Sequence, residues 1–340
     1  MSGSPEDQEA FEGQLNAKIA AYHDAGLLYA AVTLGLPERL EARAWTADAL
    51  AAELGLSPPH LHRLLRGIAS LGICAERPYG TFALTAEGQC LLPGARLREK
   101  AQIVVAQYWW PWANLAATIK TGKPAFEQLF GANVFDWRRD HAQAGALFDS
   151  YVAKETLGQA PPIIAALDFA RVGTVADIGG GHGGLLAAIL KAHPDLDGIL
   201  FDGPQRIEAA LPFLESQGVA GRVQRIGGDL LAAIPVEAGL YLLNGVLQQH
   251  ENAEARTILS NCREAMPEGA RLAIVERLLP DDAANDPAAI MLDLHMMTIT
   301  GGRVRSLAEF GALLSESGLT LAKATAAASG LSVVGARIHP

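Results

Sequence analysis

A glycine cluster that follows a short apolar run constrains the fold of this chain more than any other feature. Residues 175–183 read Val-Ala-Asp-Ile-Gly-Gly-Gly-His-Gly, so a buried strand is predicted to end in an acid and a tight turn. The glycines permit backbone conformations and close approaches that a Cβ would block. Apolar spacing predicts a helix directly afterwards, through Leu185, Leu186, Ile189 and Leu190. Such a unit is typical of nucleotide binding, and a turn that holds no ligand is the alternative.

Three further apolar runs predict strands that end in polar residues. They are Gly198–Asp202, Val223–Asp229 and Leu240–Asn244. Asp202 follows Asp177 by about 25 residues, close to the spacing at which a Rossmann-like unit places a carboxylate on a ribose diol. Because strands and helices alternate, the sequence predicts an α/β fold in this part of the chain.

Five motifs in order carry a family resemblance that spans nearly the whole chain. They are D-I-G-G-G-H-G, F-D-G-P, G-G-D-L, N-C-R-E-A-M-P-E-G-A-R-L-A-I-V-E-R and T-G-G-R-V-R-S. Together they resemble the S-adenosylmethionine-dependent small-molecule O-methyltransferases of plants and bacteria, with their hydroxyneurosporene and anthracycline-tailoring relatives. The resemblance implies an α/β chain with a mainly helical winged-helix dimerisation domain (1–97), a helical linker and substrate-pocket segment (98–168) and a Rossmann-like class I methyltransferase domain (169–340).

The resemblance also implies S-adenosylmethionine as the cofactor. The cofactor-binding residues that it implies are Asp177, Gly179, Gly181, Asp202, Asp229, Leu230 and Asn244. The first three would cradle the methionine end. Asp202 would hold the ribose, and Asp229 with Leu230 would flank the adenine.

The N-terminal region has the pattern of a winged helix. Residues 46–68 predict a capped helix, a glycine turn and a second helix, and residues 80–85 predict a short β wing. Arg63 and Arg66 could face DNA phosphates, but no broad basic face accompanies them, so we expect no nucleic-acid partner. The resemblance implies a homodimer instead. Six apolar residues supply either that contact or an internal core: Leu27, Leu28, Ala31, Leu34, Leu36 and Leu40.

Composition excludes several classes of protein. The 340 residues are 50% hydrophobic and 19% charged, which predicts a large core, and the net charge of −10 disfavours phosphate binding. The polar, acidic start and the lack of an apolar run of about 20 residues predict neither secretion nor a membrane partner. The spacing of Cys74, Cys90 and Cys262 fits reduced, mostly buried thiols in a cytoplasmic protein and supports no metal site.

Aromatic side chains in the middle segment suggest a pocket for a flat molecule. The run Tyr-Trp-Trp-Pro-Trp ends at Trp112, and Tyr151 follows in a second cluster. We expect one or two of these rings to line the substrate pocket and the rest to be buried structure. The candidate substrate-binding residues are Trp109, Trp112, Tyr151, Asp293, His295 and Met296. Asp293 and His295 lie two residues apart, so they would not share one helical face, and one of them is expected to be structural.

The catalytic positions depart from the resemblance. Members that methylate phenols usually carry the motif L-H-D-W after the fourth strand, and the histidine of this motif takes the phenolic proton. In this chain Gln248 stands at the histidine position, and a glutamine cannot accept a proton at neutral pH. Glu276 matches one acid that orients the histidine, whereas Val304 replaces the second. His250 could be a displaced base only if the following helix starts late, because two helical residues are about 200° apart.

These residues predict methyl transfer to a nitrogen or an acidic oxygen of a planar aromatic molecule in secondary metabolism. Near-attack positioning would then replace general-base catalysis. Two alternatives stay open. One is a member of the family that binds the cofactor but performs hydroxylation, elimination or pericyclic chemistry, and the other is a winged-helix regulator that senses a metabolite.

Overall fold

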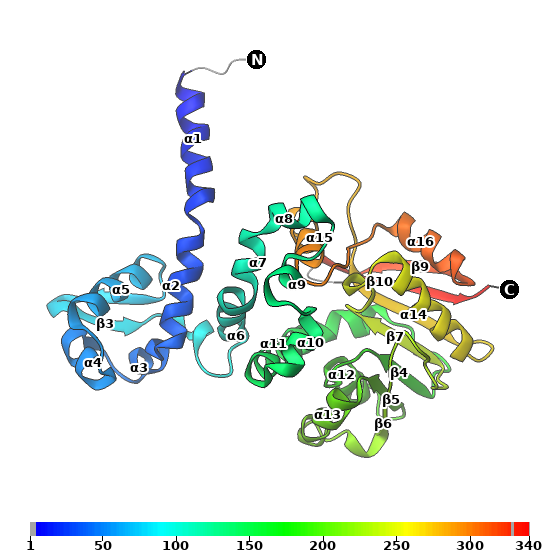
Figure 1. Ribbon diagram of the computed structural model, residues 1–340. Helices are drawn as coiled ribbons and strands as arrows, with labels where there is room; N and C mark the ends of the chain where they lie inside the picture. Colours follow the sequence, from blue (N-terminus) through cyan, green and yellow to red (C-terminus); the bar gives the residue numbers. More distant parts are fainter. Residues whose placement is uncertain (1–4, 328–329, 340) are drawn as a thin grey trace. The chain divides into compact units, whose positions relative to one another are not determined.

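The chain forms two compact units, residues 1–109 and residues 110–340, each described by itself below (Figure 1). The structure is a computed structural model that describes residues 5–327 and 330–339. The predicted boundaries at 97/98 and 168/169 stay a prediction.

The N-terminal unit is mainly helical. Its helices are α1 (Pro5–Ala20), α2 (Tyr22–Thr33), α3 (Leu36–Ala42), α4 (Ala47–Leu54), α5 (Pro58–Ser70) and α6 (Arg96–Ile103), with short helical turns at Pro78–Gly80 and Gly88–Leu91 and a π-helical turn at Val104–Tyr108. Its strands are β1 (Trp45–Thr46), β2 (Cys74–Arg77) and β3 (Thr81–Leu84), which form an antiparallel sheet in the order β1-β3-β2.

Local sequence signals explain the helix-turn-helix in this unit. The Thr46 side chain accepts a hydrogen bond from the Ala49 N–H and begins α4. Gly55 ends the helix with φ +67°, a left-handed conformation that glycine adopts without strain. Strands β2 and β3 pair as the wing. The winged-helix pattern is confirmed.

The six apolar residues proposed for either a dimer contact or a core belong to the core of one chain. Ala31, Leu36 and Leu40 are buried in this unit, and the other three pack against the same cluster. Exposed apolar side chains lie instead along the first two helices, and they are Phe11, Leu15, Ile19 and Tyr22.

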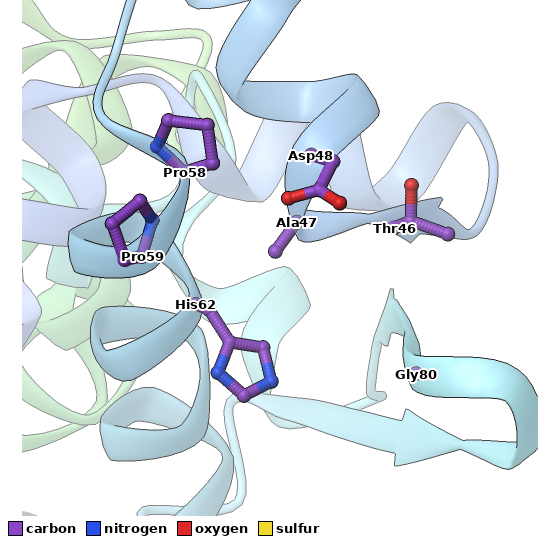
Figure 2. Close-up of a pocket in the computed structure, with 7 residues that line it drawn as sticks. All are labelled: Thr46, Ala47, Asp48, Pro58, Pro59, His62 and Gly80. Atoms are coloured by element: carbon purple, nitrogen blue, oxygen red, sulfur yellow. The ribbon is translucent and has the colours of Figure 1, made fainter.

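A shallow pocket of the N-terminal unit lies between the starts of α4 and α5 and the tip of the wing (Figure 2). His62 and Asp48 line it together with Gly80 at the wing, and the lining includes neither lysine nor arginine. Of the two arginines considered for DNA, Arg66 lies 3.4 Å from the Glu76 carboxylate.

The C-terminal unit contains the larger sheet. Its helices are α7 (Trp109–Ala113, whose first residue belongs to the N-terminal unit), α8 (Leu115–Thr121), α9 (Ala125–Phe130), α10 (Val134–Asp140), α11 (Ala142–Ala166), α12 (Gly184–Ala192), α13 (Pro204–Ser216), α14 (Asn252–Ala265), α15 (Pro287–Ile299) and α16 (Leu307–Glu316). Its strands are β4 (Thr174–Ile178), β5 (Asp197–Asp202), β6 (Val223–Gly227), β7 (Leu240–Asn244), β8 (Arg271–Arg277), β9 (Leu319–Ala326) and β10 (Leu331–Ile338).

The seven strands run in the order β6-β5-β4-β7-β8-β10-β9. Strands β4 to β8 are parallel, and β10 pairs antiparallel with both β8 and β9. One face packs against α11, α12 and α13, and the other packs against α14 and α16. The strand order reverses between β4 and β7, the point at which open α/β sheets bind ligands. The Rossmann-like prediction is confirmed.

No single helix of residues 5–327 and 330–339 is long and apolar enough to cross a membrane. Among these residues, only one pair of helices, Asp7–Thr33 with Leu36–Ala42, is together long and apolar enough to cross a membrane. These two helices are bent by 65° relative to each other. The same described residues contain no group of three or more His, Cys, Asp or Glu side chains that could hold a metal ion.

Candidate active site

The turn after β4 requires glycine for two different reasons. Gly179 and Gly181 have φ +71° and +59°, which side chains rarely tolerate. At Gly180, a Cβ would lie 2.5 Å from the Asp177 carboxyl group. A Cβ at Gly181 would meet no heavy atom within 4 Å, so open space lies beside this backbone. The turn therefore leaves room for a ligand next to the sheet.

Two carboxylates flank this turn. Asp177, at the end of β4, is buried, and its Oδ1 has no hydrogen-bond partner among the described residues. Burial, together with the nearby Asp202 charge, raises the pKa of Asp177 to about 7. Asp202, at the end of β5, accepts hydrogen bonds from the Gly181 N–H (2.8 Å) and the Gly203 N–H (2.6 Å).

The remaining cofactor candidates lie at the same edge of the sheet. Asp229 follows β6 and accepts a hydrogen bond from the Leu231 N–H at 2.9 Å. The Leu230 side chain lies beside the turn, 3.5 Å from where a Gly179 Cβ would stand. Asn244 ends β7, the neighbour of β4. A cavity of about 670 Å³ lies between α10, α11 and α13, and His182 of the glycine turn lines it.

These residues fit a nucleoside cofactor with a cationic end. An unpartnered buried carboxylate oxygen and an open glycine backbone are features that a ligand would complete, because buried polar atoms are normally hydrogen-bonded. The carboxylate at the end of the neighbouring strand, Asp202, suits a ribose diol.

The segment after β7 differs from the sequence expectation. Residues Leu247–Gln249 form one 3₁₀ turn, His250 is extended, and α14 begins only at Asn252. The helix therefore starts late, and the angle of about 200° between residues 248 and 250 does not apply. His250 Nδ1 lies 2.8 Å from Glu254 Oε2, so a carboxylate orients this imidazole.

Glu276 lies beneath the 3₁₀ turn. Its Oε1 accepts a hydrogen bond from the main-chain N–H of Gln248 at 2.9 Å, and its buried Oε2 has no partner among the described residues. Burial raises the pKa of Glu276 to about 7, although the Gln248 N–H and the nearby Arg305 charge both oppose the shift. This acid therefore holds the backbone of the turn.

The loop at residues 301–305 braces the same turn. Arg305 is fully buried and donates hydrogen bonds to the carbonyls of Leu247 and His250, each at 2.8 Å, and to Asn252 Oδ1 at 3.0 Å. A Cβ at Gly302 would lie 2.2 Å from the Gln248 carbonyl oxygen. Sequence reasoning missed both residues, although the T-G-G-R-V-R-S motif contains them and was the available signal.

Helix α15 brings two of the predicted substrate residues into polar contacts. Trp112 Nε1 donates a hydrogen bond to His295 Nδ1 at 3.1 Å, and the two rings lie 24° apart. Asp293 Oδ1 accepts a hydrogen bond from the Val304 N–H at 2.8 Å. Asp293 therefore has a structural contact, as expected for one member of this pair. Met296 is buried on the same helix.

The aromatic cluster is divided between different environments. Trp109 packs edge-on against Tyr22 within the N-terminal unit, and Tyr151 is half-buried on α11. Trp110 is 64% exposed, so the expectation that every ring outside the pocket is buried structure is wrong for this residue. The next residue of the helix, Pro111, is buried instead of Trp110, because neighbouring residues of a helix face different sides.

Comparisons with known proteins agree with this geometry. Residues 112–320 match the O-methyltransferase domain family, and residues 19–94 match the O-methyltransferase dimerisation domain. The phenazine O-methyltransferase PhzM of Lysobacter antibioticus is 36% identical over 94% of this chain and 94% of its own length. The O-demethylpuromycin-O-methyltransferase of Streptomyces alboniger is 36% identical over 88% of this chain and 81% of its own length.

More distant relatives and solved structures extend the comparison. The phenazine-1-carboxylate N-methyltransferase of Pseudomonas aeruginosa is 28% identical over 86% of this chain and 87% of its own length. The crystal structure of LaPhzM aligns with a TM-score of 0.92 at 35% identity, covering 96% of this chain and 99% of that chain.

A further structure contains the cofactor. NcsB1 from neocarzinostatin biosynthesis, solved with S-adenosylmethionine and 2-hydroxy-5-methyl naphthoic acid, aligns with a TM-score of 0.82 at 30% identity over 93% of this chain and 96% of that chain. Both matched domains, the similar relatives and the similar structures lead to one conclusion. The chain belongs to the O-methyltransferase family and is an S-adenosylmethionine-dependent methyltransferase with an N-terminal dimerisation domain.

Proposed function

We propose that this enzyme methylates a nitrogen or an acidic oxygen of a planar aromatic small molecule in secondary metabolism, as a cytoplasmic homodimer that binds neither nucleic acid nor membrane. The relatives support the substrate class, because their names include a phenazine O-methyltransferase and a phenazine-1-carboxylate N-methyltransferase. The dimerisation domain at residues 19–94 supports the assembly. The domains proposed are residues 1–97, 98–168 and 169–340.

The proposed cofactor site is the edge of the sheet from β4 to β7. S-adenosylmethionine, when bound, supplies a methyl group activated by its sulfonium. Asp177 would hold the cationic methionine end with the backbone of the glycine turn, and Asp202 would accept the ribose hydroxyls. The full set proposed is Asp177, Gly179, Gly181, Asp202, Asp229, Leu230 and Asn244.

The proposed acceptor site lies between α7, α11, α15 and the turn after β7. Trp112, Tyr151, His295 and Met296 would contact the aromatic acceptor. The contacts of Trp109 with Tyr22 and of Asp293 with Val304 favour packing roles for those two candidates.

One observation carries the proposed mechanism: the carboxylate of Glu276 holds the main-chain N–H of Gln248 instead of orienting an imidazole. The glutamine amide has no proton affinity at neutral pH. Catalysis would then come from holding the acceptor in near-attack geometry, which suffices for a nucleophile that carries a free lone pair or is already ionised.

Restoring a histidine tests this mechanism. With a substrate found among co-purifying aromatic molecules, we expect Gln248→His to change kcat less than threefold. General-base catalysis would raise it by about 10²–10⁴-fold if a proton had to leave at this position. S-adenosylhomocysteine should form in step with methylated product. Turnover without S-adenosylhomocysteine would instead establish one of the non-methylating activities.

A further inference from the structure

The cavity between α10, α11 and α13 has a charge opposite to that of the whole chain. Its lining contains four basic side chains and a histidine but only one carboxylate, whereas the chain has 37 acidic and 27 basic residues. The basic residues are Arg138, Arg139, Lys154 and Arg206, the histidine is His182, and the carboxylate is that of Asp149. A cleft lined mainly by one sign of charge concentrates ions of the opposite sign. The cavity therefore favours an anionic ligand.

Two of these side chains have hydrogen-bond donors that the protein itself does not use. Among residues 5–327 and 330–339, the Arg206 guanidinium makes no hydrogen bond, and its one ion pair is distant, with 3.9 Å between Nη1 and Asp202 Oδ2. The half-buried ring of His182 has no hydrogen-bond partner among the same residues. A guanidinium carries five N–H donors and a neutral imidazole carries one. Both side chains can therefore donate to a bound anion.

Other basic side chains of the lining add positive charge but are engaged within the protein. Arg139 is paired with two neighbouring aspartates of its own segment. The guanidinium of the buried Arg138 lies over the Phe148 ring, 3.4 Å from its centroid. Direct contact with an anionic group is therefore assigned to Arg206 and His182.

The apolar part of the lining suits an aromatic body. Phe135 of α10, Leu157 of α11 and Phe213 of α13 line the cavity, together with small residues of α11 such as Ala153. The volume of about 670 Å³ lies within the range of about 300–1,000 Å³ that is usual for small-molecule pockets. Such pockets combine apolar walls with a few polar groups that orient the ligand. An anionic group on an aromatic body therefore matches both parts of this lining.

We propose that this cavity is a second small-molecule site, which binds an aromatic anion through Arg206 and His182. A planar guanidinium forms paired hydrogen bonds with a carboxylate or a phosphate, so either group would serve as the anion. None of the residues proposed for the cofactor or the acceptor lines this cavity, so the site goes beyond the proposed function. His182 belongs to the glycine turn, which places the site next to the cofactor candidates.

The first experiment uses His182 as the reporter of binding. Full-length protein labelled with nitrogen-15 in its histidines and saturated with S-adenosylhomocysteine is titrated with 2-naphthoate, 2-naphthyl phosphate or neutral 2-naphthamide. The His182 signal, assigned by its loss in His182→Gln, should move with an anionic probe at a concentration at least about fivefold lower than with the amide. The tighter of the two anions identifies the preferred group. An equal response to the amide, or a His182 signal that neither anion moves, would overturn the proposal.

The second experiment changes the charge of the lining in both directions. We expect Arg206→Gln to weaken binding of the tighter anion at least about fivefold, and Asp149→Asn to strengthen it about twofold by removing the one negative charge. A general loss of folding cannot produce both changes. The control is Arg256→Gln, because Arg256 lies on α14 at the other face of the sheet and should not affect binding. Unchanged affinity in Arg206→Gln, or weaker binding by Asp149→Asn, would contradict the assignment.

Discussion

At the scale of single residues, the carboxylates at the ends of β4 and β5 lie in different environments. Asp177 is buried with a raised pKa, whereas Asp202 is held by two backbone N–H groups of the glycine turns. These two bonds fix the orientation of the Asp202 carboxylate, as the proposed role in binding a ribose diol would require.

Removal of this carboxylate should weaken cofactor binding. We expect Asp202→Ala to lower the affinity for S-adenosylmethionine at least tenfold, about 1.4 kcal/mol, in isothermal titration calorimetry. The matched control is Asp197→Ala, because Asp197 is the exposed first residue of the same strand. Equal affinities of the wild type and Asp202→Ala would remove Asp202 from the site.

Glu276 should make stability depend on pH. Its pKa in the folded protein is about 7, above its ordinary value of 4.5, so the folded protein holds a proton that the unfolded chain has lost. Stability that is present below pH 4.5 is therefore lost as the pH rises toward 7, by at most about 1.4 kcal/mol per pH unit. Urea unfolding without cofactor should show a smaller loss between pH 5 and 8 for Glu276→Gln. Identical slopes would contradict the buried, protonated state.

At the scale of elements, the turn after β7 depends on the loop at residues 301–305. Arg305 donates hydrogen bonds to main-chain carbonyls of the turn, and Gly302 lets the loop approach the turn closely because it has no Cβ. Two elements that are distant in sequence thus fix the position of Gln248.

A methyl group at Gly302 should displace this turn. We expect Gly302→Ala to lower kcat more than tenfold while the affinity for S-adenosylhomocysteine changes little, because the added Cβ would lie 2.2 Å from the Gln248 carbonyl and the cofactor candidates other than Asn244 lie outside β7. Gly311→Ala in α16 is the control, since a Cβ there meets nothing within 4 Å. Full activity of Gly302→Ala, measured as S-adenosylhomocysteine formed, would show that the brace is dispensable.

Elements and polar strand ends could be predicted where their signals are local. The glycine turn, the acids after β4 and β5, and the cap at Thr46 all come from neighbouring residues. The 3₁₀ turn before α14 and the Trp112–His295 bond depend on packing between distant segments, which periodicity does not report. Sequence reasoning therefore located the glycine turn and the polar strand ends, but it missed the brace formed by Gly302 and Arg305.

At the scale of the whole molecule, the exposed apolar side chains of α1 and the matched dimerisation domain point to a stable dimer. Phe11, Leu15 and Ile19 are each more than half exposed, an arrangement that a second copy would cover. We expect the full chain to sediment as a dimer at micromolar concentration. Deletion of residues 1–95 should leave a monomer or an aggregate. A monodisperse full-length monomer would contradict this assembly.

The central claim is that methyl transfer here needs no histidine base, and His250 is the residue that challenges it most directly. Glu254 orients its imidazole, as a general base requires. The decisive measurement is the single-turnover rate of S-adenosylhomocysteine formation by His250→Ala at saturating cofactor and substrate. We predict a rate within about threefold of the wild type. A loss of about 10²–10⁴-fold would show that His250 is the relocated base.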